Sequence, residues 1–322
     1  MHYNSKSLFH TPLYKSINSR APWCENFLES CGKEDSLEWD VAAIYSTLSC
    51  GFPLGDRTLF KQVKRRPWIS EVQEKGCSTL LDIPTHSYIW KEPKQAARDL
   101  FDLLCEEIEA AAGGAETIYL LLSGGLDSRV VAGITRYLKE KNKVTDNIVA
   151  VTWGGEDSRD VQYAKELAIR YGYTWHHAPL TEESLEKNIE LMAEVLGGAN
   201  SPIHLHRMDW FQKNANSDSI VLAGSYGDSV GRGEFSKRTV LELLPIKPFN
   251  IFDLLDPRAA ILAEQGVKED ISFLEARSGL DTPDYIKREH QQQGFYMRGL
   301  IAHTMSIINY SGVSHILSLI HI

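Results

Sequence analysis

The sequence predicts an α/β protein built on an open parallel sheet flanked by helices. Three segments are expected to be its strands, at residues 119–122, 146–153 and 219–223, and the first is an unbroken apolar run, as expected of a strand buried on both faces. A loop rich in glycine, serine or aspartate follows the first and the third run. With 43% hydrophobic and 24% charged residues, the 322 residues suffice for one large or two ordinary domains.

The chain divides into an N-terminal segment and a larger α/β part. Over residues 1–95, short apolar runs alternate with proline and glycine, so we expect a small β-rich segment of strands and loops. A helix is expected from Ala96 until Gly113 and Gly114 end it. Four of its residues are spaced for burial: Leu100, Leu103, Leu104 and Ile108. The second part, residues 96–322, holds the sheet over about residues 115–235.

The first predicted strand runs into the sequence S-G-G-L-D-S at residues 123–128, and a helix follows. Gly124 and Gly125 lack a β-carbon, which lets the backbone approach a ligand closely. The start of a helix offers free amide groups and the positive end of the helix dipole, so it is suited to an anion. Four apolar residues define the expected buried face of this helix: Val130, Val131, Ile134 and Leu138.

The polar side chains of the 123–128 loop suit a phosphorylated ligand. The loop is neither G-x-x-x-x-G-K-[ST] nor G-x-G-x-x-G, which excludes the two commonest glycine-rich phosphate motifs. Ser123 and Ser128 can donate hydroxyl hydrogen bonds to a pyrophosphate group. Asp127 offers a hard carboxylate of the kind that Mg²⁺ prefers. A phosphorylated nucleotide with Mg²⁺ is therefore the expected ligand.

Two further strand ends carry candidate groups. The second strand ends with Thr152 and Trp153, and the indole of Trp153 fits either adenine stacking or packing at the sheet edge. The third strand ends before Gly224, and Asp228 lies in the loop that follows. Ligands of open parallel sheets bind at the carboxyl ends of the strands. We therefore expect Asp127 and Asp228 to meet at one Mg²⁺.

These motifs carry a resemblance to a known family. Residues 123–128 resemble the pyrophosphate loop of the N-type ATP pyrophosphatases, and the flanking sequence resembles the synthetase domain of the asparagine synthetase family. Residues 224–231 are similar to the second signature of that family, with Ser225 at a position usually held by a glutamate associated with the incoming amine. The resemblance implies an adenine nucleotide alpha hydrolase-like fold, with ATP and Mg²⁺ as cofactors.

The resemblance also implies roles for individual residues. It implies catalytic roles for Asp127, Asp228 and Ser225, with Asp127 and Asp228 as the Mg²⁺ ligands. The residues implied to contact ATP are Leu121, Ser123, Gly124, Gly125, Leu126, Asp127, Ser128, Thr152, Gly224 and Tyr226. The transition state of adenylation needs a cation. Candidates for it are Lys165, Arg232 and Arg298, and Arg129 could also reach a phosphate or an acidic substrate.

The implied activity is that of an ATP-dependent, amide-forming ligase. A carboxylate, aspartate in an asparagine synthase, would attack ATP to give an acyl-adenylate and pyrophosphate, and ammonia or another amine would then displace AMP. Two alternatives stay open. One is a related synthetase that closes a ring or joins a different amine, as the β-lactam and lasso-peptide synthetases do. The other is a non-catalytic nucleotide-binding remnant.

We expect no functional glutaminase domain. Residues 55–65 resemble the closing strands of the family's glutaminase-type domain, but a complete domain of that kind does not fit before residue 95. The family's nucleophile is an N-terminal cysteine, whereas this chain starts with Met1 and its first cysteine is Cys24. Ammonia would then come from solvent or from a separate glutaminase subunit. Residues 241–262 and 285–309 are expected to be mostly helical, with breaks at Pro245, Pro248, Pro257 and Pro283. We also expect the chain to be truncated at its C-terminus relative to the family.

The amino-acid composition limits the classes of binding partner that we expect. The net charge is −9, from 34 basic and 43 acidic residues, which disfavours a nucleic-acid partner that would require a basic surface. No run approaches the roughly 20 apolar residues of a membrane span. The five cysteines contain no C-x-x-C pair, which argues against a zinc site or a disulfide framework. We therefore expect a cytoplasmic protein that acts on small molecules.

Overall fold

The computed structural model divides into two compact units. It describes residues 13–18, 22–24, 26–32, 34–50, 53, 56–66, 70–72, 78–80, 90–197, 202–224, 255–277 and 316–318. Unit 1 comprises Met1–Pro84, Glu186–His204 and Glu234–Ser306, and unit 2 comprises Thr85–Leu185, Leu205–Gly233 and Ile307–Ile322. Unit 1 thus takes in segments on both sides of residue 95, and the domain boundary proposed there stays a prediction.

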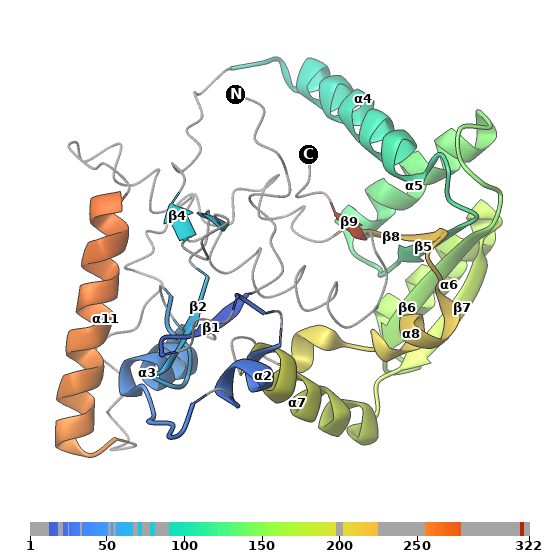
Figure 1. The fold of residues 1–322 in the computed structure, drawn as a ribbon. Helices are drawn as coiled ribbons and strands as arrows, with labels where there is room; N and C mark the ends of the chain where they lie inside the picture. The colour runs from blue at the N-terminus through green and yellow to red at the C-terminus, as the bar shows by residue number, and fades with distance from the viewer. Residues whose placement is uncertain are drawn as a thin grey trace. The chain divides into compact units, whose positions relative to one another are not determined.

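Unit 2 is built on the expected open parallel sheet (Figure 1). Its strands are β5 (Thr117–Leu121), β6 (Ile148–Gly154), β7 (Thr174–Pro179), β8 (Ser219–Ala223) and β9 (Ile316–Ser318). They lie in the order β7-β6-β5-β8-β9, and every neighbouring pair is parallel. Residue Leu121 pairs with Val151 of β6 and with Ala223 of β8. The carboxyl ends of these three strands therefore meet at one edge of the sheet.

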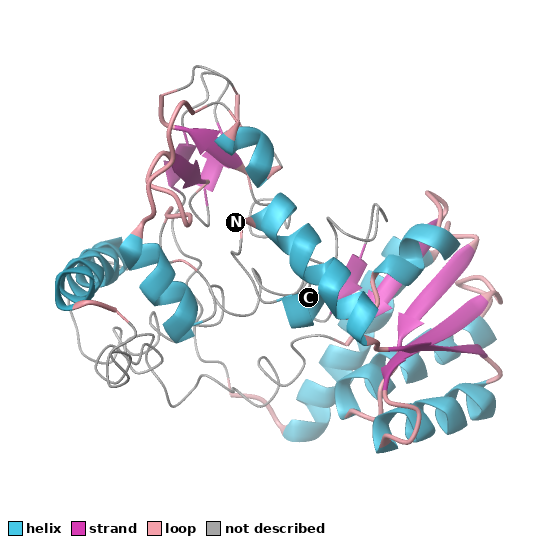
Figure 2. Ribbon diagram, turned by 90° about the horizontal axis from the view of Figure 1, so that it is seen from below, coloured by secondary structure: helices cyan, strands magenta, loops and turns pink. Residues whose placement is uncertain are grey.

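Helices cover both faces of this sheet (Figure 2). The helices α4 (Pro93–Ala112), α5 (Leu126–Glu140) and α6 (Arg159–Tyr171) share one apolar core with alternate side chains of the strands, among them Ile118 and Leu120. On the opposite face, the ring of Tyr119 packs edge to face with Trp210 and Phe211 of α8 (Asp209–Asn214). This alternation along β5 confirms the predicted α/β architecture.

Three leucine or valine positions on the expected buried faces are instead exposed. Leu100 and Leu103 in α4 are about half exposed, at 50% and 49%, and Val130 in α5 is 38% exposed. The buried residues of α4 are Leu104, Ile108 and Ala112, which recur every fourth residue along one narrow stripe. Every residue before Leu104 in that helix is at least partly exposed, so only its second half is buried. Helical spacing gives the direction of a side chain, whereas tertiary contact decides whether it is covered.

Unit 1 contains the predicted short strands together with two helices that were not predicted. The strands pair antiparallel, β1 (Tyr14–Ser16) with β2 (Val63–Arg65) and β3 (Ser70–Val72) with β4 (Ser78–Leu80). The helices are α2 (Phe27–Cys31) and α3 (Val41–Cys50). Each starts at a side-chain cap: the amide of Glu29 donates to Asn26 Oδ1 at 3.0 Å, and that of Ala43 donates to Asp40 Oδ1 at 3.1 Å. These caps are the local signals that the prediction of strands and loops overlooked.

The helix α7 (Glu182–Leu196) begins in unit 2 and ends in unit 1. At its end the hydroxyl of Tyr14 donates to the carbonyl of Leu196 at 3.1 Å. Gly197 follows with a φ of 57°, and a β-carbon there would lie 2.5 Å from the ring of Phe27. The rings of Tyr14 and Phe27 pack edge to face, so they hold this helix end against the N-terminal strands. The chain continues through a short 3-10 helix, η1 (Pro202–Leu205).

The long helix α11 (Pro257–Arg277) packs against α3 within unit 1. It begins at Pro257, one of the proline breaks expected within residues 241–262, and Asp256 Oδ1 accepts the amide of Arg258 at 2.9 Å. Gly266 allows close packing, since a β-carbon there would lie 2.5 Å from the β-carbon of Ala42. Residues 241–254 and the expected helix over residues 285–309 lie outside the described residues. Among the described helices, none is long and apolar enough to span a bilayer.

Candidate functional site at the carboxyl edge of the sheet

The 123–128 loop connects β5 to α5 and is held by its own serines. The hydroxyl of Ser128 donates to the carbonyl of Ser123 at 3.1 Å and accepts the amide of Ser123 at 3.2 Å. The two hydroxyl oxygens lie 3.1 Å apart, and the amide of Gly125 donates to Ser123 Oγ at 3.1 Å. These bonds fix the backbone of the loop in one shape before any ligand binds.

Two glycines let neighbouring elements touch this loop. A β-carbon on Gly124 would lie 2.6 Å from Asp160 Oδ1, at the start of α6. A β-carbon on Gly224, directly after β8, would lie 2.5 Å from the amide nitrogen of Ser128. The segments that follow β6 and β8 therefore contact the β5 loop from two sides. This is the convergence of strand ends that the sequence predicted.

The start of α5 has the features of an anion site. Its N-cap residue is Gly125, in an extended conformation with φ −69° and ψ 156°, and no side chain caps the helix. The first amide groups of a helix have no partner inside the helix, and the dipole makes this end positive. Asp127 lies in the same turn and is half-buried. The described part of the site thus offers amide donors for phosphate and, in Asp127, a carboxylate suited to Mg²⁺.

The other residues implied to bind ATP are placed as follows. Leu121 is buried at the end of β5, and the side chain of Leu126 is 66% exposed at the start of α5. Thr152 is buried, and its hydroxyl accepts the indole N–H of Trp175 at 3.3 Å. Three residues of the second signature, Ser225, Tyr226 and Asp228, lie outside the described residues, as do Arg232 and Arg298. No cluster of three or more His, Cys, Asp or Glu side chains forms a metal site among the residues that the structure describes.

A second group of side chains gathers at the ends of β6 and β7. The rings of Trp153 and His206 stack at 4.9 Å with an interplanar angle of 13°, so one face of the indole is covered by imidazole. His206 has a φ of 47°, which is uncommon for a residue other than glycine. Partial burial lowers the pKa of His176, and the nearby His177 and Arg207 lower it further. Sequence reasoning missed the pairing of Trp153 with His206, because only the fold joins positions so far apart.

Among the candidate cations, Lys165 and Arg129 are in described parts of the chain. The ammonium of Lys165 lies 5.1 Å from the centre of the Trp175 ring, in a cation–π contact. The Nε of Arg129 donates to the carbonyl of Gly125 at 3.3 Å, within the 123–128 loop. The structure therefore brings Arg129, rather than Lys165, into contact with the loop.

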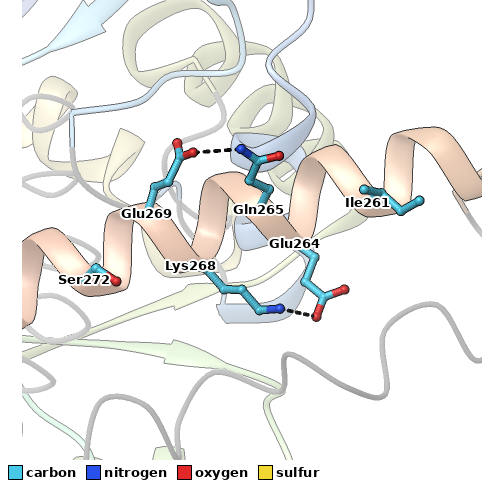
Figure 3. A pocket seen from close by; sticks show the side chains of 6 residues that line it. All are labelled: Ile261, Glu264, Gln265, Lys268, Glu269 and Ser272. Atoms are coloured by element: carbon cyan, nitrogen blue, oxygen red, sulfur yellow. Dashed lines mark hydrogen bonds and ion pairs between the residues drawn. The ribbon is translucent and has the colours of Figure 1, made fainter.

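Pockets in unit 1 do not share these features. Among the residues that the structure describes, the lining of one pocket comes from α11, shown in Figure 3: Ile261, Glu264, Gln265, Lys268, Glu269 and Ser272. Four of these side chains pair with one another, Lys268 with Glu264 at 2.9 Å and Gln265 with Glu269 at 3.1 Å. A pocket of about 290 Å³ beside Arg57 combines basic and acidic side chains. Neither includes the 123–128 loop, and the candidate site remains the sheet edge of unit 2.

Comparisons with solved structures give distant likenesses. An NH3-dependent NAD synthetase from Campylobacter jejuni has 15% identity over 65% of this chain and 96% of its own, with a TM-score of 0.34. An NMN synthetase from Francisella tularensis has 16% identity over 64% of this chain and 96% of its own, with a TM-score of 0.34. A glutamine-dependent NAD+ synthetase from Acinetobacter baumannii, in complex with ADP, has 14% identity over 77% of this chain and 60% of its own, with a TM-score of 0.33.

Comparisons of sequence are more informative. Curated proteins gave no significant match. A comparison with protein families matched residues 101–290, more than half of the chain, to the family described as asparagine synthase. The match includes the 123–128 loop, the strands β5 to β8 and the helix α11. The chain therefore belongs to the asparagine synthase family.

Proposed function

We propose that this chain is an ATP-dependent carbon–nitrogen ligase that converts aspartate to asparagine. Membership of the asparagine synthase family supports ATP use and amide formation. The observation that carries the proposal is the 123–128 loop, which is preorganised at an uncapped helix start and contacted through Gly124 and Gly224. This combination of amide donors and close backbone approach suits the phosphates of a nucleotide.

The reaction would take place in two steps. A carboxylate oxygen of aspartate attacks the α-phosphorus of ATP, the bond between that phosphorus and the bridging oxygen breaks, and pyrophosphate leaves. Ammonia then attacks the acyl carbon and AMP leaves, so that asparagine, AMP and pyrophosphate are the products. In the first step, the backbone amides at the start of α5 would bind the leaving phosphates and stabilise their charge. The hydrogen bonds of Ser123 and Ser128 would keep these amides in position.

Mg²⁺ fits the residues of this site. Asp127 places a hard carboxylate in the first turn of α5, next to the loop. We propose that Asp127 and Asp228 hold the ion, which would supply charge neutralisation for the phosphates. Asp228 follows β8 in the sequence, and β8 ends where Gly224 contacts Ser128.

The amine would reach the acyl-adenylate as free ammonia. Ser225 occupies the position at which the family usually has a glutamate, so this chain would handle the amine with a hydroxyl in place of a carboxylate. Ammonia would come from solvent or from a separate glutaminase subunit. The other substrates we propose are small molecules, and neither nucleic acid nor a membrane is among the partners.

Pyrophosphate release tests the proposal. The purified chain would be incubated with Mg-ATP, aspartate and ammonium, and pyrophosphate would be measured with and without each substrate. Asp127→Asn should lower release at least about 100-fold, because it removes a proposed Mg²⁺ ligand. Asp146→Asn is the matched control, since the carboxylate of Asp146 is 88% exposed and forms only a long 3.7 Å ion pair with Lys139.

Each outcome assigns one function. Release that depends on aspartate and is lost in Asp127→Asn supports the proposal. If release needs a different carboxylate, that compound would replace aspartate as the proposed substrate. The chain would then be a related ring- or amide-forming synthetase. A folded protein that releases no pyrophosphate with any carboxylate would be a nucleotide-binding remnant, and the proposed activity would be wrong.

A further inference from the structure

Arg129 has an unusual place in the helix that starts at the 123–128 loop. It is the fourth residue of α5, and its Nε donates to the carbonyl of Gly125, the N-cap residue, at 3.3 Å. Side chains of helices lean toward the N-terminus, and this hydrogen bond holds the guanidinium group beside the loop. The side chain is exposed, so its remaining N–H groups are accessible to a ligand.

The charge of Arg129 is poorly placed for the helix alone. A cation near a helix N-terminus faces the positive end of the dipole, which is unfavourable. The structure records no ion pair between Arg129 and a carboxylate of the described residues. Arg136, seven residues later in the same helix, shows the ordinary arrangement: its Nε pairs with Glu140 at 2.8 Å near the C-terminal end. A bound anion at the loop would relieve the repulsion at Arg129 and leave Arg136 unaffected.

We propose that Arg129 binds the β- and γ-phosphates of ATP at the 123–128 loop. This inference rests on the proposed function, since it assumes a nucleotide at that loop. The planar guanidinium group can give two parallel hydrogen bonds to phosphate oxygens. Its bond to the carbonyl of Gly125 fixes the orientation of the group before ATP binds. Among the described cations considered for this role, Lys165 instead contacts Trp175.

Two ligands test the inference, one with and one without the β- and γ-phosphates. The full chain and the variants Arg129→Met, Arg129→Lys and Arg136→Met would be titrated with α,β-methylene-ATP and with AMP by calorimetry. Arg129→Met should lower the affinity for α,β-methylene-ATP at least about tenfold, because loss of a hydrogen bond to a charged group has an effect of this size. The affinity for AMP should stay within about twofold of the original value. Arg129→Lys keeps the charge and should recover part of the loss. Arg136→Met is the control and should bind both ligands like the unmodified chain.

The outcomes separate this inference from the proposed function. If the unmodified chain binds neither ligand, the proposed function fails and the role of Arg129 fails with it. If it binds both and Arg129→Met changes neither affinity, only the role of Arg129 is overturned. If Arg129→Met lowers the affinity for both ligands equally, Arg129 supports the shape of the loop. This result too would overturn its proposed role in phosphate binding. A circular dichroism melt of each variant would confirm that it is folded.

Discussion

Asp270 should make the stability of unit 1 depend on pH. Its carboxylate binds Arg57 Nε at 2.8 Å, and Arg57 also binds Asp40 at 2.9 Å. Burial raises the pKa of Asp270 from an ordinary 3.8 to about 6; Arg57 opposes this rise, whereas Asp40 and Asp56 add to it. The folded state therefore binds this proton more tightly than the unfolded state. The resulting stabilisation is complete below about pH 4 and is lost as the pH rises through about 6. A shift of about two units corresponds to ~3 kcal/mol.

Urea unfolding between pH 4 and pH 7.5, followed by tryptophan fluorescence, measures this effect. Asp270→Asn cannot titrate, so the free energy of unfolding of the original chain, relative to this variant, should fall by ~3 kcal/mol between pH 4 and pH 7. Asp146→Asn is the control for loss of an exposed carboxylate and should keep the original pH dependence. The same pH dependence in Asp270→Asn as in the original chain would refute the assigned cause.

Three further predictions concern single contacts. Gly224→Ala would place a β-carbon 2.5 Å from the backbone nitrogen of Ser128, so pyrophosphate release should fall about 100-fold; unchanged release would show that the loop tolerates the shift. Gly197→Ala combines a positive φ with a contact of 2.5 Å to Phe27, and should lower the free energy of unfolding by ~2–4 kcal/mol in urea titrations; a loss below 1 kcal/mol would contradict this contact. Asn26→Ala removes the cap of α2 and should cost ~1 kcal/mol in the same assay, whereas Asn26→Asp should retain most of it.

The sheet of unit 2 could be predicted because its strands are encoded locally. The runs that contain Leu121, Val151 and Ala223 are apolar without interruption, as strands with two covered faces must be. The loop after β5 could be predicted for the same reason, since its glycines and serines are contiguous in sequence. Its approach to Gly224 follows from the parallel order of the strands.

Features that depend on distant partners could not be predicted. Leu100 is exposed because the first half of α4 has little tertiary cover, which helical spacing does not reveal. The stacking of Trp153 on His206 joins residues that neither pattern nor motif connects. The caps Asn26 and Asp40 were readable in principle, but the helices that they start are short and lie among prolines and glycines. Elements with strong periodicity could thus be predicted from the local sequence, whereas the other features depend on tertiary contacts.

The interleaving of the two units has a consequence for synthesis of the chain. The strands and helices around Tyr14 and Arg57 are made first, yet their partners Leu196 and Asp270 belong to segments made much later. Translation proceeds at about 5–20 residues per second, so Arg57 waits roughly 10 to 40 s for Asp270. Most of the sheet of unit 2 is made within that interval. We therefore expect unit 2 to form much of its structure on the ribosome while the early segments of unit 1 remain open to chaperones.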